Sequence, residues 1–217
     1  MASNSTPQKC YKVGIIIGSQ RVRRAGPQIT DFILQTIKAH EATKPTTDTL
    51  TLQIEFDLID VAALNLPLFN EPGVPSRIMS PEDYEHEHTR SWARTIAALD
   101  AFVFVTPQYN WGIPAGLKNA IDYLFNEWKG KPAMIVSYGG HGGDKCAGHL
   151  KTVLGGGIDM RVVEKTVNLA FPDRGFLVMA ATGKKLGLDA ADDGAPWAGE
   201  RGKITEVWEG MLQLLAA

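Results

Sequence analysis

The chain has 217 residues, of which 44% are hydrophobic and 21% are charged, a composition typical of one globular domain spanning residues 1–217. Its 22 basic and 24 acidic residues give a net charge of −2, which argues against nucleic acid or an anionic membrane as a partner. The two cysteines, Cys10 and Cys146, lack zinc or C-x-x-C spacing, which argues against a disulfide framework or a metal site.

The N-terminal stretch 1–11 has neither an apolar signal core nor an arginine-rich presequence, and we expect it to be irregular. No apolar run in the sequence approaches membrane-spanning length. We therefore expect a cytoplasmic protein with reduced thiols.

The first predicted element is a buried central strand at 13–17, a short run rich in β-branched residues. A polar loop containing Ser19, Arg21 and Arg24 follows, and a helix begins near Pro27, whose fixed φ suits a first turn. A loop before a helix N-terminus offers free backbone N–H groups to an anion, above all a phosphate. The alternative is a solvated basic face or a weak nucleic-acid patch. No G-x-G-x-x-G or P-loop motif is present, which argues against the usual dinucleotide and triphosphate loops.

Strands and helices alternate along the rest of the chain. Further strands are predicted at 52–60, 101–105, 133–136 and 160–168, and further helices at 81–99, 116–125, 145–154 and 204–215. The proline-rich stretch 64–81 predicts a long loop, and the glycine-rich stretch 182–202 an irregular segment.

Two features of the predicted helix at 81–99, its apolar face and the run at 85–88, each allow two interpretations. Ser80 is placed to cap its start, and Trp92, Ile96 and Leu99 share one face, which is either core or a subunit interface. The run Glu85 to His88 resembles a metal motif, but residues two apart on a helix face away from each other, so we expect a solvated helical face.

The alternation predicts an α/β fold with a parallel sheet and helices on both of its faces. With five strands in the order 2-1-3-4-5, the first, third and fourth strands are neighbours. Ligands of such folds bind at the carboxyl ends of the strands. One ligand is therefore expected to touch the three loops that follow these strands.

The second of these loops, "TPQYNWGIP", offers flat faces at Tyr109 and Trp111 together with exposed backbone groups, which suits a planar heterocycle. The alternative for Trp111 is a hydrophobic corner. The third loop, "SYGGHGG", is rich in glycine, which lets the main chain approach a ligand, or it is a flexible turn. His141 in this loop either moves a proton or is solvated.

Three stretches together closely resemble the NADPH-dependent FMN reductase family, in particular the fungal NAD(P)H-dependent FMN and quinone reductases. They are "VGIIIGSQRVRRAGPQI", "TRSWARTIAALDAFVFVTPQYNWGIPAGLKNAIDYL" and "GKPAMIVSYGGHGGDKC". The resemblance covers roughly 12–170 and implies a flavodoxin-like three-layer α/β/α sandwich. It offers no role for the N-terminal extension or for the stretch 182–202.

The resemblance also implies where FMN is bound. Gly18, Ser19 and Arg21 would hold the phosphate, assisted by Arg24 or Arg23; Pro107, Gln108, Tyr109, Asn110 and Trp111 would lie along the ribityl chain and isoalloxazine; Ser137, Tyr138, Gly139 and Gly140 would contact the pyrimidine end. Backbone N–H groups near the ring stabilise a reduced flavin electrostatically.

The implied activity is ping-pong hydride transfer from NADPH or NADH through FMN N5 to a quinone or similar acceptor, with no catalytic side chain and no metal. A homodimer, or a tetramer, is implied as well, with the partner chain walling the flavin. A flavodoxin-like electron carrier is a second interpretation, although such carriers tend to be strongly acidic. A flavin redox sensor acting through a partner protein is a third.

Overall fold

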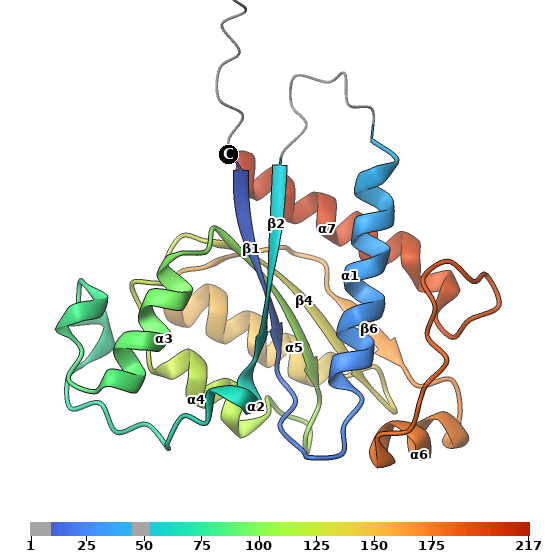
Figure 1. The fold of residues 1–217 in the computed structure, drawn as a ribbon, viewed down its shortest axis with the longest axis horizontal. Coiled ribbons are helices and arrows are strands. Elements are labelled where there is room, and N and C mark those ends of the chain that lie inside the picture. Colours follow the sequence, from blue (N-terminus) through green and yellow to red (C-terminus); the bar gives the residue numbers. More distant parts are fainter. Residues whose placement is uncertain (1–9, 45–52) are drawn as a thin grey trace, which may run out of the picture.

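The computed structural model describes residues 10–44 and 53–217. Strands and helices alternate through these residues (Figure 1). The strands are β1 (Cys10–Ile17), β2 (Gln53–Asp60), β3 (Ala101–Pro107), β4 (Pro132–Gly139), β5 (Arg161–Val162) and β6 (Val167–Ala170). The α-helices are α1 (Gly26–Ala42), α2 (Val61–Leu64), α3 (Glu87–Ala97), α4 (Ala115–Asp122), α5 (Asp144–Lys151), α6 (Arg174–Thr182) and α7 (Arg201–Ala216).

The sheet is parallel, with the strand order β2-β1-β3-β4-β5, which confirms the predicted order. The predicted fifth strand is interrupted, and its two parts, β5 and β6, pair with opposite ends of β4. Glu164 and Lys165 lie in the interruption, where their exposed side chains form ion pairs with Lys151 and Glu206. β2 begins at Gln53, and Leu52 lies outside the described residues.

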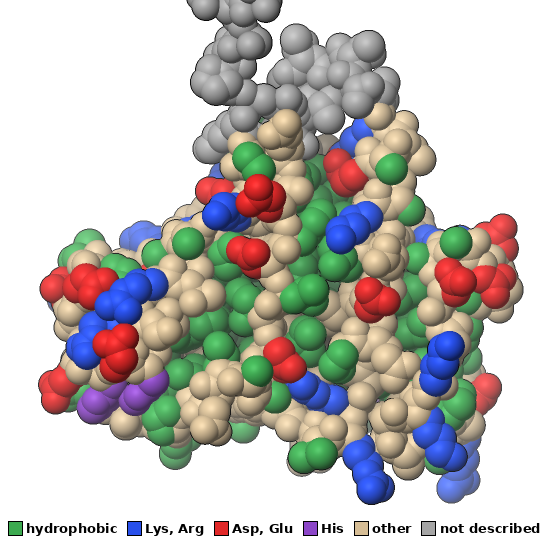
Figure 2. Space-filling model, in the orientation of Figure 1, with side chains coloured by type: hydrophobic (Ala, Val, Ile, Leu, Met, Phe, Trp, Pro, Cys, Tyr) green, Lys and Arg blue, Asp and Glu red, His purple; other side chains and the backbone are tan. Residues whose placement is uncertain are grey.

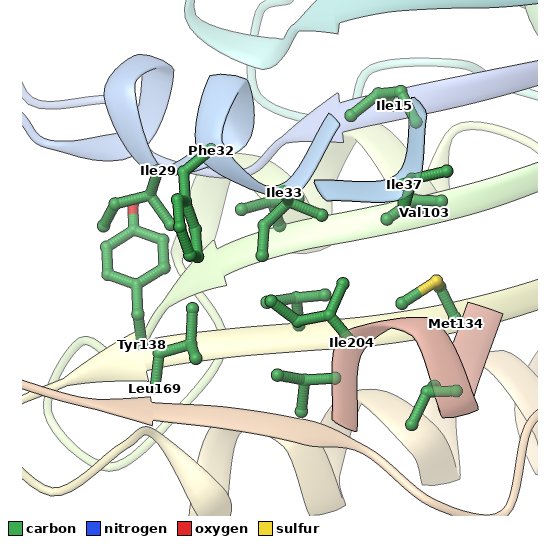
Figure 3. Close-up of a cluster of buried hydrophobic side chains, with 14 of the residues drawn as sticks. Ile15, Ile29, Phe32, Ile33, Ile37, Val103, Met134, Tyr138, Leu169 and Ile204 are labelled. Atoms are coloured by element: carbon green, nitrogen blue, oxygen red, sulfur yellow. The ribbon is translucent and has the colours of Figure 1, made fainter. Parts of the chain in front are cut away.

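Two apolar cores cover the two faces of the sheet, which confirms the three-layer sandwich. Alternate residues of β3 face opposite sides: Val103 packs with α1 and α7, whereas Phe104 packs with α3, α4 and α5. Figure 3 shows Ile33 and Ile37 of α1, one helical turn apart, lying over the strands. Each such buried side chain stabilises the fold by about 1.5–3 kcal/mol.

The helix predicted at 81–99 is broken. A short 3-10 turn, Pro81–Asp83, is capped by Ser80 Oγ, which accepts from the Glu82 N–H at 3.4 Å. The α-helix α3 begins only at Glu87, so the predicted solvated helical face over 85–88 is wrong. His86 is extended before the helix, and its ring stacks on that of His88, with centroids 5.1 Å apart.

The face formed by Trp92, Ile96 and Leu99 belongs to the core, because each of these side chains is at most 2% exposed.

Within the described ranges, no helix combines the length and the apolar character needed to cross a membrane. From Gly183 to Trp197 the chain forms turns without a helix or a strand.

Helix α6 was not predicted from the sequence. It begins after Asp173, whose Oδ1 accepts from the Phe176 N–H at 2.8 Å, and it ends at Gly183, whose φ of 71° is in the left-handed region. An N-cap aspartate and a C-terminal glycine are ordinary helix boundaries. These two signals, nine helical residues apart, were available in the sequence.

Candidate functional site

The three predicted loops meet at the carboxyl ends of β1, β3 and β4, at the lower edge of the molecule in Figure 1. We call them the first loop (18–25), the second loop (107–114) and the third loop (139–143). Together with α6 they surround a hollow. It is lined by Ser19, Arg21, Arg24, Ala25, Pro107, Gln108, Tyr109, Tyr138, Gly139, Gly140, Phe171, Leu177, Ala180 and Ala181.

The end of the hollow beside α1 is built for an anion. Ser19 is buried, and its Oγ has no hydrogen-bond partner among the described residues. No side chain caps the N-terminus of α1, so its first N–H groups remain open. A Cβ placed on Gly26 would lie 2.1 Å from Ser19 Oγ, so only glycine leaves that hydroxyl its place.

Two arginines of the first loop differ in their surroundings. Arg24 Nη1 donates to Asp60 Oδ1 at 2.8 Å, and its other terminal nitrogen pairs with Oδ2. This hydrogen bond with Asp60 raises the pKa of Arg24 above its usual value, and Arg24 also donates to the Ser19 carbonyl, which ties the loop to β2. Arg21 lies over the ring of Tyr109, 5.2 Å from its centroid, and so bridges the first and second loops.

The second loop contains a tight turn with two residues in the left-handed region. Tyr109 and Gly112 exchange backbone hydrogen bonds of 3.1 and 2.9 Å, and the φ values of Asn110 and Trp111 are 48° and 66°. This is the pattern of a type I′ turn, which normally carries glycine at its second central position. Trp111 is 58% exposed and stacks on His141 at 6.1 Å, so the hydrophobic-corner alternative is wrong.

Tyrosine hydroxyls supply further unused donors around the hollow. The hydroxyls of Tyr109 and Tyr138 are buried and, among the described residues, have no hydrogen-bond partner. Burial raises the pKa of Tyr138, so its hydroxyl stays neutral and able to donate. Buried polar atoms are nearly always paired, so unpaired hydroxyls around one hollow indicate a polar ligand.

The third loop is held by the side chain of Ser137. Its Oγ donates to the Gly142 carbonyl at 2.8 Å and accepts from Asn168 Nδ2 at 2.7 Å. Gly142 and Gly143 have φ values of 77° and 80°, and a Cβ on Gly143 would lie 3.0 Å from that of Ser137. Ser137 lies outside the lining, and its side chain fixes the shape of the loop.

Gly18 and Gln108 also stabilise the frame of the site. The Gly18 N–H donates to the Val105 carbonyl at 2.9 Å, and a Cβ at Gly18 would lie 2.8 Å from Leu117. Gln108 Oε1 accepts from the Cys146 N–H at 3.0 Å and so caps the first turn of α5. Gln108 lines the hollow, whereas Gly18, Asn110 and Trp111 lie beside it.

The model of the NADPH-dependent FMN reductase family matches residues 11–172. The chain belongs to this family.

An NAD(P)H-dependent FMN reductase of Saccharomyces cerevisiae is 46% identical over 154 residues, which cover 70% of this chain and 77% of the relative. Another, from Nectria sp, is 34% identical over 204 residues, covering 94% and 96%. Among solved structures, the flavoenzyme NAD(P)H:(acceptor) oxidoreductase FerB of Paracoccus denitrificans matches with a TM-score of 0.60 at 20% identity, covering 94% of this chain and 98% of that one. This last likeness supports the fold.

Membership of the NADPH-dependent FMN reductase family confirms the expected enzyme class, because this family uses FMN with NAD(P)H as electron donor. The donors around the hollow fit that cofactor: unpaired hydroxyls and two arginines suit a phosphate and a polar chain, and the glycines of the third loop leave room for a flat ring.

The family match ends at residue 172, before α6, and three of the five lining residues that sequence reasoning missed lie in α6. Phe171, Leu177, Ala180 and Ala181 line the hollow, as does Ala25 of the first loop. They are apolar, so no chemical motif marks them. The capping signals of α6 would have revealed a helix, although not its position over the site.

Proposed function

We propose that this chain is an FMN-dependent oxidoreductase that takes two electrons from NADPH or NADH and passes them to a quinone or a similar flat acceptor. The observation that carries the proposal is the gathering of three buried, unpartnered hydroxyls, those of Ser19, Tyr109 and Tyr138, around one hollow. The chain that carries these hydroxyls belongs to a family of FMN reductases, and named quinone reductases are among its relatives.

The residues divide by the part of FMN that they would hold. Ser19, Arg21 and the open first turn of α1 would bind the phosphate, because hydrogen bonds from charged and backbone donors suit it best. Arg24 would keep the first loop in position through its ion pair with Asp60. The second loop, with Pro107, would border the ribityl chain and the ring.

At the other end, Tyr138 and the backbone of Gly139 and Gly140 would contact the ring, while Ser137 would act through the loop that it braces. Gly18, Asn110 and Trp111 would act in the same indirect way, by shaping the first and second loops. Backbone donors aimed at a reduced ring stabilise its negative charge.

When bound, FMN supplies the chemistry by accepting a hydride from NAD(P)H and returning two electrons to a quinone, which takes up two protons in all. No nucleophilic side chain is required. Burial raises the pKa of Cys146 to about 11, so this thiol stays protonated, and it also lies outside the lining. The role of the protein is to bind and orient FMN and to polarise its ring.

We propose a ping-pong order, in which donor and acceptor use the same open face in turn. A supporting feature is that one hollow opens where the three loops meet. Anaerobic stopped-flow absorbance should show fast bleaching by NADPH and, in a second mixing step, fast recovery on adding a quinone. Bleaching slower than steady-state turnover would defeat the proposal.

We also propose a cytoplasmic homodimer. Leu68, Val74 and Met79 in the long loop after α2 are 64–85% exposed, which suits a surface covered by a second subunit. Light scattering of the purified protein should give twice the mass of one chain, and the mass of a single chain would contradict the dimer.

A further inference from the structure

Three basic residues without an acidic partner lie close in sequence to residues that line the hollow. Arg23 lies between Arg21 and Arg24 in the first loop, and Lys184 and Lys185 follow the end of α6. All three are exposed, and none forms an ion pair with any residue in 10–44 or 53–217. We call these three residues the basic rim.

The fold holds these distant segments together. Gly183, with a φ of 71°, turns the chain against the first loop, so that a Cβ placed on it would lie 3.6 Å from both Cα and Cβ of Arg23. Gln28 then fixes the following residues, since its Nε2 donates to the Lys184 carbonyl at 3.0 Å and its Oε1 accepts from the Leu186 N–H at 2.9 Å. The backbone that carries both lysines is therefore anchored beside Arg23.

Figure 2 shows Lys and Arg side chains gathered along this lower edge of the molecule, over α6 and below α1. The chain as a whole carries a net charge of −2, so this local excess of positive charge is not a general property of its surface. Like charges held close together repel one another, and an anionic ligand relieves that repulsion.

The phosphate of the cofactor already has donors deeper in the hollow, at Ser19, Arg21 and the start of α1. The basic rim lies outside this set, next to the lining residues Ala181 and Arg24. It is therefore available to a second ligand that reaches the hollow from solvent. In an NAD(P)H oxidoreductase that ligand is the dinucleotide.

We propose that Arg23, Lys184 and Lys185 bind a phosphate group of the dinucleotide co-substrate, and that this group is the 2′-phosphate of NADPH. The inference rests on the proposed function and adds to it a basis for preferring NADPH to NADH. A 2′-phosphate carries close to two negative charges near pH 7 and so gains more from three cations than a ribose hydroxyl does. The same cations could instead contact the pyrophosphate, which both dinucleotides share.

The test compares the holoenzyme with the Lys184→Gln, Lys185→Gln double variant and with Arg23→Gln. The matched control is the double variant Arg77→Gln, Lys203→Gln, which removes the same charge from two exposed positions outside the hollow and the basic rim. The kinetic readout is KM for NADPH and for NADH. The binding readout, which needs no turnover, is calorimetry with 2′,5′-ADP and with ADP-ribose.

We expect KM for NADPH and Kd for 2′,5′-ADP to rise about five- to tenfold in the lysine double variant, as loss of exposed charge contacts of about 1 kcal/mol implies. Values for NADH and ADP-ribose should stay within about twofold, and the control should match the wild type. Equal weakening of NADPH, NADH and ADP-ribose would assign the cations to the pyrophosphate and overturn the 2′-phosphate. Unchanged constants throughout would overturn the basic rim as a binding site.

Failure of this inference is distinguishable from failure of the proposed function. An active yellow enzyme whose constants do not respond to the variants contradicts only the basic rim. A colourless protein inactive with both dinucleotides contradicts the proposed function, and 2′,5′-ADP binding then still decides whether the three cations recognise a phosphate.

Discussion

At the scale of single residues, the shape of the site depends on positions where the backbone or a close neighbour restricts the type of residue. Gly26 leaves room for the Ser19 hydroxyl, and Trp111 occupies a left-handed position that favours glycine. The polar loop between the first strand and the first helix was predictable, because a strand, a polar loop and a helix N-terminus are local features. The bracing roles of Ser137 and Gln108 could not be predicted, since their partners, Asn168 and Cys146, are distant in sequence.

Gly26→Ala tests the proposed phosphate site beside α1. The new Cβ would lie 2.1 Å from Ser19 Oγ and force that hydroxyl out of place. Because a hydrogen bond to a charged group is worth about 1.5–3 kcal/mol, we expect FMN affinity, measured by quenching of flavin fluorescence, to fall about tenfold or more. Gly148→Ala is the control, since a Cβ there meets open space; a similar loss of affinity in both variants would contradict the role given to Gly26.

Trp111→Gly separates stability from function. A left-handed conformation costs a residue other than glycine roughly 1 kcal/mol, and Asn-Gly is the preferred pair for this turn, so we expect the free energy of unfolding to stay the same or rise by up to about 1 kcal/mol. The stack on His141 would be lost, and KM for a quinone should increase. Urea unfolding and steady-state kinetics measure the two effects. A marked loss of stability with unchanged KM would show that the indole acts in packing.

At the scale of elements, the site contains helix α6 in addition to the three loops that the motifs predicted. Four strands, the sheet order and most helices were predictable because the hydrophobic pattern records which faces are buried. The break before α3 and the interruption between β5 and β6 were not predicted, and both involve charged side chains with partners elsewhere in the chain. Glu71 accepts hydrogen bonds from the Glu85 N–H and the Thr89 hydroxyl, and Glu164 and Lys165 form ion pairs with Lys151 and Glu206. α6 carries apolar residues over the hollow, and its placement depends on packing that no local pattern describes.

Asp173→Ala tests the contribution of α6. Loss of the N-cap hydrogen bond to Phe176 should cost about 1 kcal/mol and let the helix open more often. Hydrogen exchange should therefore accelerate over 174–182, and FMN should dissociate faster. Ser80→Ala removes a longer cap bond, at 3.4 Å, from a turn at the other end of the molecule and should change neither quantity. If exchange over α6 accelerates while the rate of FMN release does not change, α6 is not a wall of the cofactor site.

At the scale of the whole molecule, the sheet sets the position of everything else. β1, β3 and β4 are neighbours, so three loops up to about 120 residues apart in sequence share one edge. That arrangement was predictable from the alternation of strands and helices. The second apolar core, beneath α3, α4 and α5, covers the opposite face of the sheet and includes Ala147, which follows the buried thiol Cys146.

The pH dependence of overall stability follows from that thiol. Burial raises the pKa of Cys146 from 9.0 to about 11, so the folded state holds its proton more tightly than the unfolded state does. This contribution is complete below pH 9 and is lost as the pH rises through 11, by about 3 kcal/mol. Urea unfolding of the wild type and of Cys146→Ala should show their stability difference falling over this range. A constant difference would mean that the thiol is no more buried than in the unfolded chain.

The most direct test of the central claim is a crystal structure of the protein with FMN. We predict the phosphate beside Ser19, Arg21 and the first turn of α1, the ribityl chain along Pro107 and Tyr109, and the ring against Gly139 and Gly140 with α6 closing one side. A phosphate bound elsewhere, or a flavin that leaves the hydroxyls of Ser19, Tyr109 and Tyr138 unpaired, would contradict the account.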